Sequence, residues 1–497
     1  MRTARHILTI TAAASIALVG WASGCGGSGT TSGFGNGPGN GNGNPNGGGD
    51  GGSILGNNPD GGPSFGNQMD GGGPSGMCVG LQCQVHACGG GGSTTISGVV
   101  YDPAGNNPLY DVVVYVPNSP PQPFKSGASC DTCADLYTGN PVATALTDAA
   151  GKFQITGAPD GANIPLVIQI GKWRKQITLP SVKQCQDNPQ PDKSLKLPKN
   201  HSEGDIPMIA ISTGGADSLE CLLSRIGVDQ SEYVPGGGAS QNHIQIYQGG
   251  ISIFGMGAPN TSPPGPASSA SLWASQADLM KYDMVLLSCE GSETLSMNQQ
   301  ALFDYAKGGG RVFASHFHYA WFNTGPFGSA NLATWSPGTN NMGDINANIV
   351  TTLPNNQPFP KGQALKQWLG NVSALTAGEL PIKVARHNAD VSAANTPSQA
   401  WIVADNNAKP AGATEYFSFN TPLGTPEANQ CGRVVFSDLH VGAASGDYAN
   451  GSMTVPTGCA NNGLSPQEKA LEFMLFDLSS CVTPNGQPPV PPPPTPK

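Results

Sequence analysis

Residues 297–318, MNQQALFDYAKGGGRVFASHFH, contain a helix pattern, a stop signal and a strand pattern in direct succession. Apolar residues recur at helical spacing up to Lys307, and the glycines at 308–310 are typical of a helix C-terminus. The run that follows, RVFASHF at 311–317, is apolar enough for a strand buried on both faces. This order predicts one helix and one strand of a parallel sheet flanked by helices, with Ser315 and His316 near the carboxyl end of the strand.

Further elements of the same kind extend over residues 205–483. Strands are expected at 206–212, 243–247, 283–288, 311–317 and 433–439, and helices at 217–226, 272–281, 297–307 and 466–478. Asp217, followed by Glu220, has the spacing of a capping box at a helix start, and so has Ser465. The pattern predicts a doubly wound, mostly parallel α/β sheet, in which ligands bind beyond the carboxyl ends of the strands.

Polar residues and glycines gather at those carboxyl ends. They lie in four segments, at 213–215, 289–291, 315–318 and 438–440. Because parallel strands all end at one edge of their sheet, the segments are expected to meet there and form a pocket. The candidate binding residues are Gly214, Gly215, Ser315 and Asp438.

Two of these segments carry a resemblance to a known family. GGGRVFASH at 308–316 and GRVVFSDLH at 432–440 resemble trehalose-utilisation (ThuA-like) proteins, which have the class I glutamine amidotransferase-like fold. In that family one histidine stands at the turn where amidotransferases place their nucleophilic cysteine, and another follows the last strand. The resemblance implies these roles for His316 and His440. Since Ser315 and His316 occupy the turn, the thiol needed for glutamine hydrolysis is absent there, and glutaminase activity is not expected.

Three kinds of site fit these residues. His316 with His440 or Glu290 would make a general acid/base pair. His316 and His318, two residues apart on a strand, would share a face and bind zinc together with His440, Asp438 or Glu290. A strand that ends at His316 would instead turn His318 away. A polar pocket without chemistry is the interpretation we favour, and no cofactor is expected.

Aromatic residues follow the second histidine of this segment. Trp321 lies in a long stretch rich in Gly, Asn, Ser and Pro, where an aromatic ring would either stack on a sugar or plug the loop onto the domain. The plug is the favoured interpretation, with ligand binding by Trp321 as its alternative.

Residues 93–200 have a different pattern, with short β-branched runs separated by turn residues. The runs lie at 96–101, 112–116, 142–147, 153–156, 164–170 and 173–179. Gly171 fits the first position of a two-residue hairpin turn, which needs a positive φ. Six or seven strands of this kind predict a β-sandwich.

The β region also resembles a known family. The segments SGVV at 97–100, VVV at 112–114 and GKF at 151–153 are similar to those of carboxypeptidase regulatory-like domains, which have a transthyretin-like fold. The resemblance implies a non-catalytic spacer or adhesion module.

The N-terminus has the features of a bacterial export signal. Residues 1–24 combine a basic start with an apolar stretch, and Ala22-Ser23-Gly24-Cys25 resembles a lipobox, which implies lipidation of Cys25; a plain secretory signal is the alternative. Residues 25–77 are expected to be a disordered tether, because 22 of the 52 residues after Cys25 are glycine. The proline-rich tail, 484–497, is expected to pack on nothing.

Eleven cysteines follow Cys25, and export makes disulfides the expected state of most of them. The Cys-rich segment 78–92 is expected to be held by disulfides, with zinc binding as the alternative. Cys130 and Cys133 have thioredoxin-like spacing, but they lie in a loop and are interpreted as structural. An odd count leaves one cysteine unpaired, and Cys289 is the predicted one because it follows the apolar run at 284–287.

Charge and composition restrict the function further. The chain has 23 basic and 33 acidic residues and a net charge of −10, which argues against a nucleic-acid partner. The sequence predicts an exported, lipid-anchored cell-envelope protein facing the periplasm or the cell surface. Its expected partners are the membrane, through the anchor, and a glycan or envelope protein bound without catalysis. The alternative is a carbohydrate-directed hydrolase or isomerase that uses His316, His440 and Glu290; the oligomeric state is not predicted.

Overall fold

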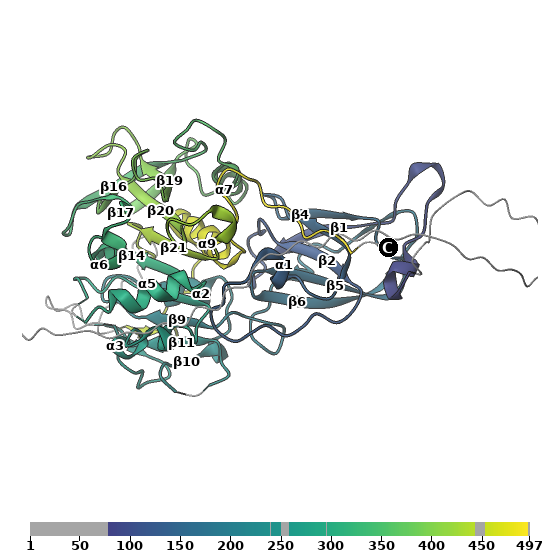
Figure 1. Cartoon of the computed structure of the whole chain (residues 1–497), viewed down its shortest axis with the longest axis horizontal. Coiled ribbons are helices and arrows are strands. Elements are labelled where there is room, and N and C mark those ends of the chain that lie inside the picture. Colours follow the sequence, from purple (N-terminus) through teal and green to yellow (C-terminus); the bar gives the residue numbers. More distant parts are fainter. Residues whose placement is uncertain (1–77, 239, 250–257, 295, 443–452, 496–497) are drawn as a thin grey trace, which may run out of the picture. The chain divides into compact units, whose positions relative to one another are not determined.

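The computed structural model describes residues 78–238, 240–249, 258–294, 296–442 and 453–495 (Figure 1). The export signal, Cys25 and the tether at 25–77 lie outside the described residues. By their contacts the described residues belong to one compact unit. The chain is of mixed α/β type and contains several sheets.

Two four-stranded sheets contain the β-branched runs of the first region. One sheet has the order β4-β1-β7, with β8 also paired to β1, and the other has the order β3-β2-β5-β6. The strands are β1 Thr95–Tyr101, β2 Val113–Pro117, β3 Pro141–Leu146, β4 Lys152–Thr156, β5 Gly161–Ile170, β6 Trp173–Val182, β7 Asp187–Pro189 and β8 Leu195–Lys196. All six predicted runs are confirmed as strands, and Ile96 of one sheet and Val114 of the other belong to the same hydrophobic core.

The predicted hairpin between β5 and β6 is also confirmed. Gly171 has a φ of 55°. An added Cβ at this position would lie 1.9 Å from the carbonyl oxygen of Ser479. Glycine is therefore required twice here, for the turn conformation and for the close approach of the hairpin to the last helix.

A ten-stranded sheet organises the rest of the chain (Figure 1). Its order is β10-β11-β9-β13-β14-β21-β20-β19-β16-β17, and the strands from β10 to β21 in this order run parallel, whereas the other four pair antiparallel. The strands are β9 Ile209–Ser212, β10 Tyr233–Pro235, β11 Ile244–Tyr247, β13 Met284–Leu287, β14 Arg311–Ser315, β16 Asn341–Ile349, β17 Leu380–Arg386, β19 Ser398–Ala404, β20 Thr414–Thr421 and β21 Gly432–Ser437. Two-stranded pairs are formed by β12 Asn260–Thr261 with β22 Thr454–Val455 and by β15 Thr334–Trp335 with β18 Ala389–Asp390.

Six of the ten strands run parallel, so the sheet is mostly parallel as expected, but four antiparallel strands that were not predicted extend it. The sequence pattern identified the five strands β9, β11, β13, β14 and β21, but none of the four antiparallel strands. Strand β16, with the sequence NMGDINANI, is rich in Asn, Asp and Gly, and most of its residues are exposed or half-buried. Such residues are depleted in strands, so no strand signal stands out.

The helices confirm some of the predicted boundaries and correct others. They are α1 Cys133–Leu136, α2 Leu219–Arg225, α3 Ser269–Leu272, α4 Gln276–Leu279, α5 Gln299–Lys307, α6 Gly325–Gly328, α7 Pro360–Asn371 and α9 Pro466–Ser479. The capping box at Ser465 is confirmed, whereas the single helix expected at 272–281 is two one-turn helices. Asp217 does not cap α2, because Ser218 stands at that position and Oδ1 of Asp217 accepts a bond from the backbone N–H of Val441.

Five disulfides connect ten of the described cysteines. They join Cys78 to Cys83, Cys88 to Cys185, Cys130 to Cys431, Cys133 to Cys481 and Cys221 to Cys459. The two cysteines with thioredoxin-like spacing bind different partners, which confirms their structural interpretation. Cys289 is the free, buried cysteine that the odd count predicted.

The proline-rich tail contacts strand β3, so the expectation that it packs on nothing is wrong. The backbone N–H of Thr495 donates to the carbonyl of Pro141, and the hydroxyl of Thr144 donates to the carbonyl of Pro492, both at 2.8 Å. Strand β3 is at the edge of its sheet, and an edge strand has unpaired backbone groups that another segment can bind. In Figure 1 the yellow end of the chain runs back toward the region of β1 and β4. Among the helices of the described ranges, none is both long and apolar enough to cross a membrane.

Candidate functional site

The carboxyl ends of three neighbouring strands bring Cys289, His316 and His440 together. Strand β14 pairs in parallel with β13 on one side and with β21 on the other, so the residues that follow the three strands meet at one edge. One sulfur or nitrogen atom from each of the three side chains lies within 4.8 Å of the other two. All three side chains are buried.

His316 is held in a defined orientation by two contacts. Its Nδ1 lies 3.3 Å from Sγ of Cys289, and its Nε2 lies 3.2 Å from the carbonyl oxygen of Thr339. A carbonyl oxygen only accepts hydrogen bonds, so Nε2 carries the proton and Nδ1 presents its lone pair to the thiol. His316 also has a φ of 43°, a conformation that is uncommon for residues other than glycine and is often found at functional sites.

The His440 ring lies beside His316, and among the described residues no group hydrogen-bonds to this ring. The two rings are 5.0 Å apart and nearly perpendicular. The His440 side chain is 1% exposed, and neither ring nitrogen has a hydrogen-bond partner among the described residues. Such a buried polar side chain is exceptional in folded proteins.

Burial keeps all three groups in their neutral forms. It lowers the pKa of His316 to about 2, with further contributions from His440 and Arg386, and it lowers the pKa of His440 to about 3. Burial also raises the pKa of the Cys289 thiol to about 12. The pair of Cys289 and His316 is therefore a neutral thiol donating to a neutral imidazole, and not the thiolate–imidazolium pair of a cysteine nucleophile.

Two of the predicted site residues lie outside this group. Strand β14 ends at Ser315, and His318 belongs to the 3₁₀-helix His316–Trp321, where its Nδ1 contacts the carbonyl oxygen of Ser315 at 3.0 Å. The expected set of His316, His318 and His440 is thus replaced by one in which Cys289 takes the place of His318. Glu290, the next residue after Cys289, is buried but is not a member of the group.

Three other predicted binding residues lie next to the group, and two of them contact the backbone of Cys289. Oγ of Ser315 accepts a bond from the backbone N–H of Cys289 at 2.9 Å. Gly214 packs so closely on Cys289 that an added Cβ would lie 2.1 Å from the carbonyl oxygen of that cysteine, and Gly215 is buried beside it. These residues position the carboxyl edge of the sheet, and glycine at 214 is required by the close packing.

Trp321 does not face a binding site. It is fully buried, and its ring packs against Trp273 at 5.1 Å. The interpretation of this loop as a plug therefore agrees with the structure. The ring offers no exposed face on which a sugar would stack.

Asp438 belongs to a buried pair of carboxyl groups. Its Oδ2 accepts a bond from the backbone N–H of Asn388, and burial raises its pKa to about 8. Burial and the nearby Asp438 raise the pKa of Glu415, on the adjacent strand β20, well above its usual value. Glu415, Arg386 and Thr339 carry no sequence signal of a site, because they lie on or beside segments that were not identified as part of the sheet.

A second histidine pair surrounds Glu232, and sequence reasoning missed it. The buried carboxylate accepts bonds from the backbone N–H groups of His201 and His243, at 2.8 and 3.0 Å, and contacts Nδ1 of the two rings at 2.6 and 3.1 Å. Burial alone would raise the pKa of Glu232, but the hydrogen bonds from the two histidines outweigh it and lower the pKa to about 2.

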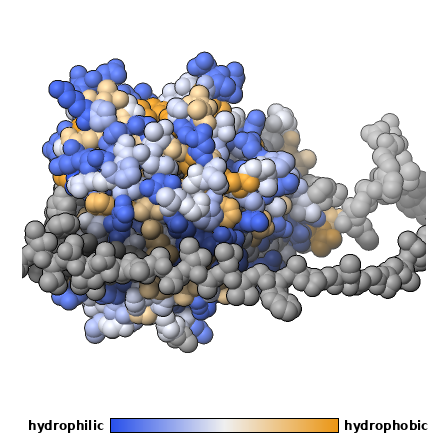
Figure 2. All heavy atoms as spheres, turned by 60° about the vertical axis from the view of Figure 1, so that its left-hand side comes forward, coloured by the Kyte–Doolittle hydropathy of each residue, from blue (hydrophilic) through white to orange (hydrophobic). Residues whose placement is uncertain are grey.

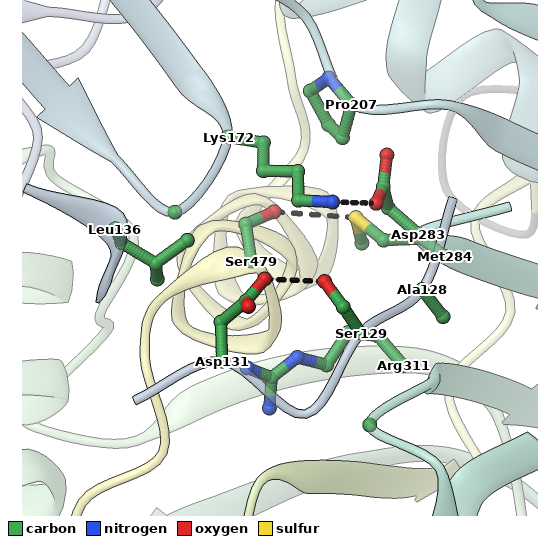
Figure 3. Close-up of a pocket in the computed structure, with 12 residues that line it drawn as sticks. Ala128, Ser129, Asp131, Leu136, Lys172, Pro207, Asp283, Met284, Arg311 and Ser479 are labelled. Atoms are coloured by element: carbon green, nitrogen blue, oxygen red, sulfur yellow. Dashed lines mark hydrogen bonds and ion pairs between the residues drawn. The ribbon is translucent and has the colours of Figure 1, made fainter. Parts of the chain in front are cut away.

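A small cavity lies at the opposite, amino ends of β13 and β14 (Figure 3). Its volume is about 40 Å³, and Nζ of Lys172 spans it to reach Oδ1 of Asp283 at 2.6 Å. A space of this size holds water rather than a substrate. A much larger groove, of about 820 Å³, is lined mainly by polar residues, among them Asn106, Asn461 and Lys199.

The side chains capable of chemistry and the large groove therefore lie in different parts of the structure. The group of Cys289, His316 and His440 offers a thiol and two imidazoles in a closed environment, which suits coordination rather than hydrolysis. The polar groove offers space and hydrogen-bonding groups without a catalytic set. No family model, curated protein or solved structure matches this chain.

Proposed function

We propose that this chain is an exported, lipid-anchored cell-envelope protein that binds an anionic glycan of the envelope without turning it over. The observation that carries the proposal is the separation just described, with closed, neutral candidate catalytic residues on one side and a large polar groove on the other. The face of the molecule drawn in Figure 2 is mainly hydrophilic, with only scattered apolar residues.

The groove has the composition expected for such a ligand. Four asparagines line it, together with the cations Lys199, Arg225 and Lys469 and one carboxyl group, that of Asp102. Asp102 is buried, and burial raises the pKa of its carboxyl group. Arg225 is already paired with the buried carboxylate of Glu468, so Lys199 and Lys469 are the cations that face an anionic ligand in a chain with a net charge of −10. Amide groups bind sugar hydroxyls, and ammonium groups bind carboxylate or phosphate substituents.

Export and anchoring belong to the same proposal. Five disulfides among the described residues are compatible with an oxidising compartment. Lipidation of Cys25 rests on the lipobox-like sequence alone. Metabolic labelling with a radioactive fatty acid tests it: the wild type incorporates label and sediments with membranes, whereas Cys25→Ser loses both properties. An unlabelled wild type would leave a plain secretory signal as the explanation.

The finer fold assignments are part of the proposal as well. We assign residues 93–200 to a transthyretin-like sandwich of the carboxypeptidase regulatory-like kind, supported by its six predicted strands. We assign residues 205–483 to a doubly wound, ThuA-like domain of the class I glutamine amidotransferase-like fold. The parallel strands β13, β14 and β21 support this, because they place His316 and His440 side by side.

Calorimetry with the full mature chain tests the binding function. Acidic and neutral oligosaccharides from the envelope are titrated into the wild type and into Lys199→Gln, with Lys409→Gln, an exposed lysine outside the groove, as the matched control. Losing a charge-assisted hydrogen bond is expected to weaken binding of the acidic oligosaccharide by roughly 10- to 100-fold. The proposal fails if no acidic oligosaccharide binds, or if the two lysine variants behave alike.

The second candidate function is a carbohydrate-directed hydrolase or isomerase. The convergence of His316 and His440 favours it, since the ring centres are 5.0 Å apart. Their burial and low pKa values count against it, because a general base must reach its substrate and bind a proton near the working pH. If His316→Gln retains glycan binding and the wild type releases no product, the binding function is favoured.

A further inference from the structure

We propose that Cys289, His316 and His440 bind one zinc or copper ion. The three side chains come from the carboxyl ends of β13, β14 and β21, and their potential ligand atoms lie within 4.8 Å of one another. Thiolate and imidazole are ligands that both metals prefer, and a set of one cysteine and two histidines occurs with each. The proposal is independent of glycan binding, because the metal ligands do not line the groove.

The distances suit a metal ion between the thiol and the imidazole. Zinc lies about 2.3 Å from a cysteine sulfur and about 2.0–2.1 Å from a histidine nitrogen, so two such ligands at a tetrahedral angle are about 3.5 Å apart. Sγ of Cys289 and Nδ1 of His316 are 3.3 Å apart. The site therefore needs a shift of only a few tenths of an ångström to admit the ion.

The surroundings prepare His316 and Cys289 as ligands. The Thr339 carbonyl binds the Nε2 proton of His316, which leaves Nδ1 free to coordinate, and metal-binding histidines are oriented by such contacts. The backbone of Cys289 is fixed on both sides, because its N–H donates to Ser315 and its carbonyl accepts from Ala216. The two ligands are thus held in place without a metal.

His440 supplies an independent observation. It is 1% exposed, and neither of its ring nitrogens has a hydrogen-bond partner within the described part of the chain. Burying an imidazole without partners costs free energy that a ligand would recover. Because the ring lies next to His316, the ligand that would complete both histidines is a single ion.

The charges around the site act in opposite directions. Arg386 lies close enough to lower the pKa of both imidazoles, so it also opposes a cation. Asp217 acts on Cys289 with the opposite sign. When the ion binds, the Cys289 thiol releases its proton to solvent and the sulfur coordinates as a thiolate, which offsets one of the two charges of a divalent ion.

The other histidine pair serves as the matched control. Both carboxylate oxygens of Glu232 already accept hydrogen bonds, so His201 and His243 do not leave a buried group without a partner. The rings are also more exposed, at 46% and 20%. The potential ligand atoms of His201, Glu232 and His243 also lie within 4.8 Å of one another, so this group has the same proximity without an unpartnered ring. Removing its two histidines should leave the proposed site intact.

The experiment loads the full mature chain, purified without reductant so that the disulfides persist, with zinc, copper or cobalt. We expect one equivalent of zinc or copper per chain by mass spectrometry, and competition between the two metals shows which one the site prefers. Cobalt(II) in the zinc position should give a sulfur-to-metal charge-transfer absorption. His201→Gln/His243→Gln should keep this absorption, Cys289→Ser should lose it, and His440→Gln should weaken binding by more than the roughly 10- to 100-fold cost of losing an outer-shell partner.

The proposal is overturned if the wild type binds neither metal stoichiometrically, if cobalt binds without the charge-transfer absorption, or if Cys289→Ser and the wild type bind alike. A variant that fails to fold is recognised by its thiol count and circular dichroism. In that case alkylation of the wild-type thiol during partial unfolding decides: protection of Cys289 by zinc supports the site, and equal labelling with and without zinc rejects it.

Discussion

The two histidine pairs of this molecule have similar ring separations but very different surroundings. The rings of His201 and His243 are 5.5 Å apart and share the carboxylate of Glu232, while those of His316 and His440 are 5.0 Å apart and lie beside the thiol of Cys289. In the first pair each carboxylate oxygen accepts two hydrogen bonds, whereas in the second pair the His440 ring has no hydrogen-bond partner among the described residues.

The difference shows that proximity of histidines does not by itself make a functional site. Around Glu232 both carboxylate oxygens accept hydrogen bonds from the two histidines, so no ligand is needed to complete the cluster. We call Glu232, His201 and His243 the clasp, because these residues join the segment at 201 to β10 and β11. Around Cys289 the His440 imidazole has no hydrogen-bond partner in the part of the chain that the structure describes, so a ligand would complete the cluster.

The largest effect on stability is expected from Glu232→Ala. The substitution leaves the backbone N–H groups of His201 and His243 and their two rings without an acceptor, so we expect the free energy of unfolding to fall by about 3–5 kcal/mol. Urea unfolding of the oxidised chain measures it. The control is Glu203→Gln, which removes an exposed ion pair with Lys175 and should cost about 1 kcal/mol or less. Equal losses for the two variants would show that the clasp does not stabilise the fold.

The second prediction concerns the reactivity of Cys289. Its pKa of about 12 makes the thiolate about a thousandfold scarcer than in an exposed cysteine, so iodoacetamide should modify the native, metal-free chain at least that much more slowly than a free thiol. After unfolding in urea, one thiol per chain should react among the eleven cysteines that follow Cys25. Rapid labelling of the native chain would show that the site is open and would favour the enzymatic alternative.

The sequence predicted those features of the Cys289 site that depend on short stretches of the chain. The strands that carry the site were identified because buried parallel strands are short apolar runs between helix signals, and His316 and His440 were found at their ends. Cys289 was correctly predicted to be free, but its contact with His316 was not foreseen. That contact was accessible in principle, since β13 and β14 are successive strands of a parallel sheet and their ends are neighbours.

The other features of the two sites depend on contacts between distant segments, which short sequence patterns do not predict. Glu232, His201 and His243 come from three separate segments, and only the pairing of β10 with β11 brings them together. Arg386 is the last residue of β17 and Thr339 lies two residues before β16, and neither of these antiparallel strands was predicted from the sequence. The position of His318 depended on whether the strand ended one residue earlier or later, which side-chain periodicity does not decide.

A third prediction uses the pH dependence of stability. The pKa of His440 is about 3 in the folded chain and about 6.5 when unfolded, so below pH 6.5 the unfolded state binds a proton that the folded state does not. Stability is therefore fully present above pH 6.5 and declines as the pH falls toward 3, by about 1.4 kcal/mol per pH unit from this residue. His440→Gln removes this contribution. Between pH 6 and pH 4 the free energy of unfolding should therefore fall by about 2–3 kcal/mol less in the variant than in the wild type.

Urea unfolding at both pH values, with metal removed by a chelator, measures this difference. Leu439→Ala is the control, because it creates a cavity next to His440 without removing a titrating group. It should lower stability by similar amounts at the two pH values. Parallel pH profiles for His440→Gln and the wild type would mean that His440 is protonated or exposed in the folded chain.

The smallest effect is expected from His201→Gln, at the exposed side of the clasp. The side chain is 46% exposed and supplies one of the four contacts to Glu232, while its backbone N–H continues to donate to the same carboxylate. Because water can replace the lost ring contact, we expect a loss of about 1 kcal/mol or less. The same measurement on His243→Gln, where the ring is 20% exposed, should give a larger loss. If His201→Gln lowers the free energy of unfolding as much as Glu232→Ala does, the His201 ring and not the backbone holds the carboxylate. The clasp would then depend on its histidine side chains, as the Cys289 site does.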